Sequence, residues 1–370
     1  MKARIAFLLT LASAFLLATM PTVAHATSAG LIAATASEAG AAADAGPTVT
    51  LDVFVSDKSG NPVRGLQAQD FKVLDNKQPR NIQVFRAFQA PTAGAAPAAA
   101  EPPVEAILVI DMINARSEVM ADERRNLIEY LKQSGGRLAV PTSFVFLSDS
   151  DVKIQGQPTR DANVLLAALD ANQPVRRELS FQGGDNAAIQ MRESSLQALG
   201  GLALKLSEKP GRKLVIWISP GWLSFTNVST RKSAQEQRQL YDYIANLTTV
   251  LRMAEITLYS VDPEGAASSE NNEGDRIFGE YAKGVANPGQ ADNGNLVLQA
   301  IAAQTGGKVL FGNNNSAGMV QQCLGDARDY YEVTFDAPHA EHPNEFHGIQ
   351  IEVDKPKVKT RTRVGYYAQP

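Results

Sequence analysis

The run Val104–Asp111 constrains the fold more than any other stretch of this sequence. It reads Val-Glu-Ala-Ile-Leu-Val-Ile-Asp, a nearly continuous apolar strand that ends on an acidic side chain. Such strands are typical of parallel sheets that are covered by helices on both faces. In these sheets ligands bind in the crevice at the carboxyl ends of the strands. Asp111 is therefore a candidate site residue.

Strands and helices alternate over residues 104–328. Candidate strands lie at 105–110, 143–147, 213–218, 256–261 and 308–311, with a short edge piece at 152–154. Candidate helices lie at 118–134, 161–171, 187–207, 233–253, 294–304 and 316–327. Apolar strands separated by amphipathic helices indicate an α/β fold. We therefore expect a doubly wound, mainly parallel sheet here.

Segments of β type flank this region on both sides. Residues 47–89 and 329–370 contain runs in which apolar and polar side chains alternate. Neither segment has enough strands to cover an apolar face by itself. We expect the two to form one β-sandwich into which the α/β domain is inserted. The alanine-rich stretches 27–46 and 90–103 predict a disordered lead and an extended linker.

The first residues predict export. Lys2 and Arg4 precede an apolar run, and Ala24-His25-Ala26 has the small-x-small pattern of a cleavage site. We expect residues 1–26 to be a signal peptide and the mature protein to be secreted or periplasmic, with no later transmembrane segment. The formal net charge of −4 gives no basic surface, which argues against nucleic acid and anionic membranes as partners.

Several short motifs occur in an order that resembles a known family. They are Asp70-Phe71-x-Val73-x-Asp75, Gly211-Arg212-Lys213, Leu258-Tyr259-Ser260-Val261-Asp262-Pro263, Thr305-Gly306-Gly307 and Arg363-Val364-Gly365-Tyr366-Tyr367. Together with the strand that ends at Asp111, they resemble the bacterial VWFA-related proteins of the acidobacterial type. The resemblance implies a von Willebrand factor A-like domain with flanking β segments and an extracytoplasmic location.

The resemblance also implies a metal-ion-dependent adhesion site, which this sequence lacks in part. The family pattern after the first strand is Asp-x-Ser-x-Ser, and here the serine positions are Ile113 and Ala115. The family also uses a threonine from a second loop and an aspartate from a third. Mg²⁺ requires near-octahedral oxygen ligands. We therefore expect a degenerate site and no cofactor.

Replacement oxygen ligands leave an alternative open. Asn114 and Ser117 follow Asp111, the second loop offers Asp185 or Asn186, and the third offers Ser219. If Asn114, Asp185 and Ser219 complete the coordination of Asp111, Mg²⁺ or Mn²⁺ binds here.

The remaining histidines and the single cysteine have one structural and one chemical interpretation each. His339, His342 and His347 lie close together with two glutamates and would suit Zn²⁺ or Cu²⁺. The segment also reads as a solvated hairpin connection, which we favour. Cys323 sits at helical spacing among apolar residues and is expected to be a core thiol, against an intermolecular disulfide.

The sequence gives little support to an enzymatic function. It has no Gly-x-Ser-x-Gly elbow and no phosphate-binding loop. We expect a non-enzymatic binding, adhesion or scaffolding module that recognises a protein or another macromolecule through the loops 111–117, 181–186, 219–229 and 262–295.

Two aromatic residues of the third loop are the candidate anchors for such a partner. Trp222 and Phe225 would be exposed in this role, because aromatic side chains dominate interface energetics; otherwise both pack under the loop as core. The alternatives for the whole chain are a metal-dependent enzyme or metal-carrying envelope protein that uses Asp111 or the histidines, and a purely structural envelope component.

Overall fold

The computed structural model describes residues 48–89, 103–148, 151–172, 184–222, 232–265 and 278–370. The predicted signal peptide, the alanine-rich lead, nearly all of the 90–103 linker and Phe225 lie outside these residues. In the part of the chain that the structure describes, no helix is long and apolar enough to cross a membrane.

The central sheet has the strand order β11-β10-β9-β5-β6-β7. Its strands are β5 (Val104–Asp111), β6 (Arg137–Leu147), β7 (Val152–Ile154), β9 (Arg212–Ile218), β10 (Ile256–Val261) and β11 (Val309–Leu310). The five strands from β11 to β6 are parallel, while β7 and the short β8 (Thr159–Asp161) pair with β6 antiparallel. Counted from β5 and leaving out β8, this is the doubly wound order 3-2-1-4-5-6, with its switch point between β5 and β9.

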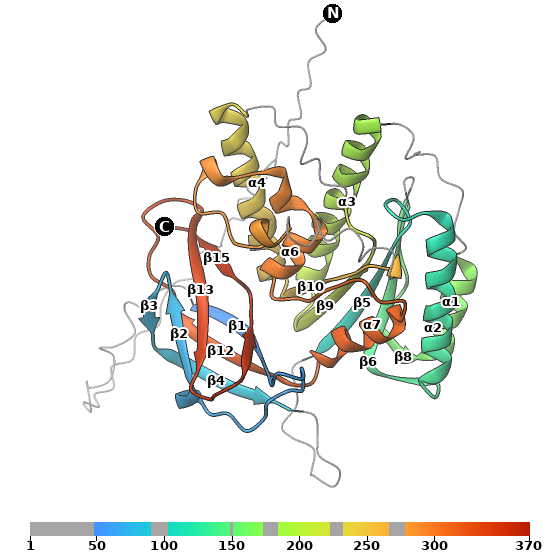
Figure 1. Ribbon diagram of the computed structural model, residues 1–370, viewed down its shortest axis with the longest axis horizontal. Helices are drawn as coiled ribbons and strands as arrows, with labels where there is room; N and C mark the ends of the chain where they lie inside the picture. Colours follow the sequence, from blue (N-terminus) through green and yellow to red (C-terminus); the bar gives the residue numbers. More distant parts are fainter. Residues whose placement is uncertain (1–47, 90–102, 149–150, 173–183, 223–231, 266–277) are drawn as a thin grey trace, which may run out of the picture. The chain divides into compact units, whose positions relative to one another are not determined.

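Helices cover both faces of this sheet (Figure 1). One core contains side chains of α1 (Ser117–Gln133), α2 (Ala162–Ala171) and α7 (Ser316–Gly325). The other contains side chains of α3 (Gly184–Ser207), α4 (Ala234–Met253) and α6 (Leu298–Gln304). Successive residues of β5 alternate between the two, with Leu108 in the first and Val109 in the second. Both faces are therefore buried, and the predicted fold class is confirmed.

The flanking segments form two antiparallel four-stranded sheets, in the orders β14-β1-β12-β4 and β15-β13-β2-β3. The strands are β1 (Thr48–Ser56), β2 (Phe71–Asp75), β3 (Gln78–Arg80), β4 (Ile82–Phe88), β12 (Tyr330–Asp336), β13 (Glu345–Val353), β14 (Lys359–Arg361) and β15 (Gly365–Ala368). N-terminal β1 pairs with C-terminal β12, and β2 pairs with β13. Both sheets thus need strands from both ends of the chain, as a shared sandwich requires.

The sandwich and the α/β region share side chains at strand β15. Tyr366 belongs to the core of the sandwich, while its neighbour Tyr367 packs into the core that lies over α3 and α4. The Tyr367 hydroxyl also donates to the carbonyl of Val285 at 3.1 Å. Arg212 at the start of β9 pairs with Asp52 of β1 at 2.7 Å. These contacts join the two regions, which lie in one compact unit spanning residues 45–370.

Candidate functional site

Asp111 lies at the carboxyl end of β5, beside the switch point of the sheet, and is completely buried. Its Oδ1 accepts hydrogen bonds from the backbone N–H groups of Ile113 at 3.0 Å and Asn114 at 3.1 Å. Its Oδ2 accepts from Asn114 Nδ2 at 2.8 Å and from Trp217 Nε1 at 2.9 Å. Each carboxylate oxygen therefore already has two donors, which is about what its lone pairs can accept.

Side chains of the loop after β5 pack into the cores on both faces of the sheet. Ile113 belongs to the core over α3 and α4, and Ala115 to the core over α1 and α7. Asn114 Nδ2 also donates to the hydroxyl of Ser195 in α3 at 2.8 Å, and this hydroxyl donates to the carbonyl of Met191. At the two positions where the resemblance implies serine, apolar side chains thus anchor the loop in place of metal ligands.

Asn114 Oδ1 is buried without a hydrogen-bond partner, but the described residues do not by themselves supply the near-octahedral oxygen set of a divalent cation. A cation at the carboxylate would have to displace Trp217 or Asn114, and the side chains at 113 and 115 have no oxygen. The Ser219 hydroxyl, at the end of β9, is buried and accepts from the backbone N–H of Gly221 at 3.2 Å. Among the residues with described positions, no group of three or more His, Cys, Asp or Glu side chains could hold a metal ion.

The remaining predicted polar site residues are exposed or have side chains that the structure does not describe. Ser117 is exposed and is the first residue of helix α1. Asp185 and Asn186 lie in the first turn of α3, and the structure does not describe their side chains.

The prediction that Trp222 is an exposed anchor is wrong. Trp222 is 2% exposed and packs edge-on against Trp217, with ring centroids 5.2 Å apart and an interplanar angle of 80°. Gly221, at φ 108°, turns the chain back under the end of β9, where a side chain would meet Gln299. Trp222 is therefore a core residue that packs against Trp217, whose indole N–H donates to Asp111.

The three histidines do not form a cluster. His339 and His342 are exposed in the connection between β12 and β13, as expected for a solvated loop. The prediction is wrong for His347, which lies within β13 and is 4% exposed. Its Nδ1 hydrogen-bonds to Asp75 Oδ1 at 2.8 Å, and its ring stacks on Tyr366, whose hydroxyl donates to the same carboxylate. His347 thus completes a buried polar network of the sandwich.

The segment 262–295 is only in part a loop at the ligand edge. Asp262 and Glu264 are at the end of β10, where the Asp262 carboxylate accepts from the Glu264 N–H at 2.8 Å. Residues 278–297 instead pack on the α/β core, with Val285 and Ala291 buried. This half contributes the short helices η4 (Pro288–Gln290) and η5 (Asn293–Leu296), and Gln304 Nε2 donates to the Tyr281 carbonyl.

Cys323 is fully buried in α7, and burial raises the pKa of its thiol. The core interpretation therefore holds, and the interpretation as an intermolecular disulfide is contradicted because the sulfur has no access to solvent.

The exposed rim of this edge includes residues that the sequence analysis did not single out. Arg116 pairs with Glu264 at 3.5 Å and so joins the loop after β5 to the loop after β10. Three exposed asparagines, at positions 313, 314 and 315, follow β11. The signal was present, because a polar Gly-Asn-Asn-Asn run directly after a predicted strand must lie at the same edge.

The chain matches no protein-family model and no curated protein. Among solved structures it is similar to proximal thread matrix protein 1 of the mussel byssus, at 10% identity and a TM-score of 0.33, over 70% of this chain and 48% of that one. It is also similar to the vWF domain of the pili tip protein Mfa5 of Porphyromonas gingivalis, at 15% identity and a TM-score of 0.23, over 39% and 49%. The pilus adhesin SpaC of Lactobacillus rhamnosus GG is similar at 9% identity and a TM-score of 0.34, over 83% and 48%. The chain spans about half the length of each of these proteins. At these TM-scores the similarities give no evidence on the fold beyond the strand order of the sheet itself.

Proposed function

We propose that this chain is an exported, non-enzymatic binding module that recognises a protein through the loops at the carboxyl edge of its central sheet, without a metal ion. The observation that carries the proposal is the set of four hydrogen bonds by which the protein itself saturates Asp111. They hold the loop after β5 in one conformation. A preformed loop loses little conformational entropy on binding, which favours affinity.

The exposed rim supplies the contacts of such an interface. Arg116, at the end of the first loop, is exposed and pairs with Glu264. Ser117 and Glu118, the first residues of α1, are exposed next to it in the chain, and the asparagines after β11 extend the same edge. Arginine and amide side chains at a rim give specificity through charge and hydrogen bonding. Export rests on the charged start, apolar run and Ala24-His25-Ala26 of the sequence.

The experiment immobilises the full-length mature protein and measures how much of a partner it retains from the native envelope fraction. Wild-type protein should retain a partner in EDTA, and Arg116→Glu should weaken that retention about tenfold, because it reverses an exposed charge of the rim. Lys132→Glu is the matched control, since Lys132 is exposed at the far end of α1. Equal capture by Arg116→Glu, or loss of capture in EDTA, would contradict the proposal.

The alternative of a metal-dependent enzyme or metal carrier makes the opposite prediction for EDTA. In that case chelation removes the bound ion and with it the activity or the cargo.

A further inference from the structure

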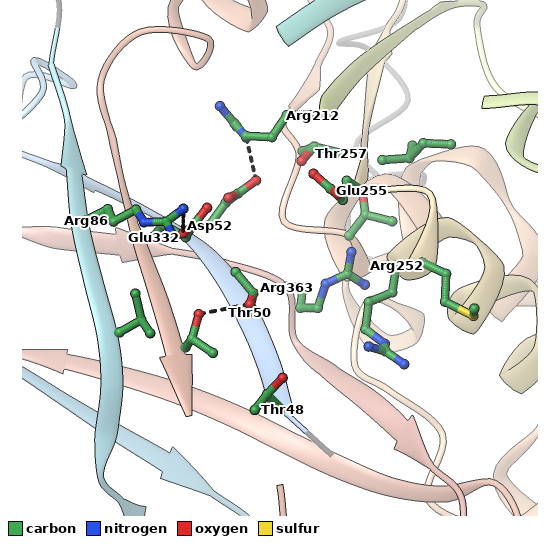
Figure 2. A pocket seen from close by; sticks show the side chains of 15 residues that line it. Thr48, Thr50, Asp52, Arg86, Arg212, Arg252, Glu255, Thr257, Glu332 and Arg363 are labelled. Carbon is green, nitrogen blue, oxygen red and sulfur yellow. Dashed lines mark hydrogen bonds and ion pairs between the residues drawn. The ribbon is translucent and has the colours of Figure 1, made fainter. Parts of the chain in front are cut away.

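A cavity of about 470 Å³ lies at the amino edge of the central sheet, opposite to the edge that holds Asp111 (Figure 2). Arg212 at the start of β9 and Ile256 and Thr257 at the start of β10 form one wall. The facing wall is the outer surface of the sheet β14-β1-β12-β4. On β1, the period of two places Thr48, Thr50 and Asp52 on this surface, while Val49 and Leu51 point into the sandwich.

Most charged groups around the cavity are already paired. Arg212 binds Asp52 at 2.7 Å and lies over the ring of Tyr330. Arg86 binds Glu332 at 3.1 Å. These two pairs account for two of the three carboxylates that line the cavity, and the third, Glu255, belongs to an exposed residue.

Two further arginines line the same cavity and have no such partner. Figure 2 shows Arg252, from the end of α4, and Arg363, from the turn before β15, side by side. Arg363 is 9% exposed, and its Nη1 is buried without a hydrogen-bond partner; the Nε of Arg252 is in the same state. Neither makes an ion pair within the ranges that the structure describes. Burial and the neighbouring charge of Arg252 lower the pKa of Arg363 to about 10.

The backbone of Arg363 is held in place by its neighbours. Gly306 has φ 84°, and a Cβ there would lie 2.8 Å from the backbone nitrogen of Arg363. The next residue, Val364, donates its N–H to the Gln304 carbonyl. The backbone of residues 363 and 364 therefore packs against the end of α6, which sets the point from which the Arg363 side chain extends.

A buried charged donor that lacks an acceptor destabilises the fold, and two like charges side by side add to that cost. An oxyanion removes both costs, because a carboxylate or phosphate accepts paired hydrogen bonds from guanidinium groups. The hydroxyls of Thr50 and Thr334 on the facing wall hydrogen-bond to each other at 2.9 Å, which leaves one of the two O–H groups free to donate.

We propose that this cavity is a binding site for a small oxyanion, a phosphate or a small carboxylate, with Arg252 and Arg363 as its principal ligands. The site lies at the opposite edge of the sheet from Asp111, so its test does not depend on the proposed binding of a partner through the rim.

Titration of the full chain with inorganic phosphate and with succinate, at constant ionic strength, tests the proposal. Calorimetry should give a saturable one-to-one isotherm for at least one of them, and the tighter of the two identifies the chemistry of the ligand. Arg252→Gln should weaken binding at least tenfold, because it removes one of the two free guanidinium groups. Arg125→Gln removes the same charge from an exposed part of α1 and should leave binding unchanged.

A second measurement does not depend on the folding of any variant. In the wild-type protein, the Nε–Hε signals of Arg252 and Arg363 should shift with the same saturation curve as the heat. Absence of saturable binding of both anions up to millimolar concentration would overturn the proposal and leave the cavity filled with water. Binding that Arg252→Gln does not weaken, or that moves neither arginine signal, would overturn it as well.

Discussion

The two edges of the central sheet hold buried charges in opposite states. At the carboxyl edge, the Asp111 carboxylate accepts four hydrogen bonds from the protein. At the amino edge, Arg363 is almost equally buried and its Nη1 has no acceptor. Burial alone therefore does not identify a ligand site. The number of partners that the protein already supplies separates a structural charge from one that is available to a ligand.

The largest effect should come from removing Asp111. Asp111→Ala leaves two backbone N–H groups, Asn114 Nδ2 and Trp217 Nε1 buried with fewer acceptors, which we expect to cost about 4 kcal/mol in the free energy of unfolding. Urea denaturation measures it. Asp122→Ala, on the exposed face of α1, is the control and should change stability by less than about 0.5 kcal/mol. Similar stabilities of the two variants would show that Asp111 is not a structural charge.

A third buried charge sharpens the comparison, because it lines none of the cavities described and its neighbours Ser316 and Asn126 offset its burial only in part. Both oxygens of Glu123 in α1 are buried without a hydrogen-bond partner. Burial raises the pKa of this carboxyl from 4.5 to about 7, and the neighbouring Ser316 and Asn126 lower it by less. The folded protein thus keeps a proton that the unfolded chain releases between these pH values, so stability falls as the pH rises through this window.

Glu123→Gln should therefore stabilise the protein at pH 8, by up to about 3 kcal/mol, and leave it nearly unchanged at pH 4.5. Urea denaturation at both pH values measures the difference. Glu118→Gln, at an exposed position of the same helix, should show no such pH dependence. If Glu123→Gln is no more stable than wild type at pH 8, hydrogen bonds to the Glu123 carboxylate offset the effect of its burial, and the prediction is wrong.

The two tryptophans provide a matched pair at the carboxyl edge. Trp217 Nε1 donates to Asp111, whereas Trp222 Nε1 is buried without a partner. Phenylalanine removes similar atoms at each position, so the difference between the variants isolates one hydrogen bond to a charged group. Trp217→Phe should cost about 2 kcal/mol more than Trp222→Phe in thermal or urea unfolding. Equal costs would mean that Asp111 does not depend on the indole.

The smallest effect is expected at the rim. Arg116 and Glu264 form an exposed pair at 3.5 Å, with exposed fractions of 64% and 27% for the side chains. Arg116→Gln should change the free energy of unfolding by less than about 0.5 kcal/mol. A loss above 1 kcal/mol in urea denaturation would assign Arg116 a structural role and weaken its use as a probe of partner binding.

The sequence predicted the fold because the relevant signals are local. Continuous apolar strands, helical periodicity and alternation at the two ends of the chain each follow from a short window, and the position of Asp111 follows from the end of one strand. The resemblance to VWFA-related proteins of the acidobacterial type stays a prediction.

The states of the site residues depend on contacts that no short window contains. Trp217 lies 106 positions from Asp111, and Asp75 lies 272 positions from His347. A buried indole and an exposed aromatic anchor look alike in the sequence, so Trp222 was misassigned. The proximity of Arg252 to Arg363 likewise arises only when the inserted α/β region and the sandwich fold together.

Calorimetric titration of the purified protein with Mg²⁺ and Mn²⁺ tests most directly whether the protein's own hydrogen-bond donors saturate the Asp111 carboxylate. The account predicts no saturable heat up to about millimolar concentration, since Mg²⁺ gives up its water only for a near-ideal set of oxygen ligands. A one-to-one isotherm with a dissociation constant of about a micromolar, abolished by Asp111→Asn, would contradict it. That result would show that Asn114, Asp185 or Ser219 completes a working metal site at this edge.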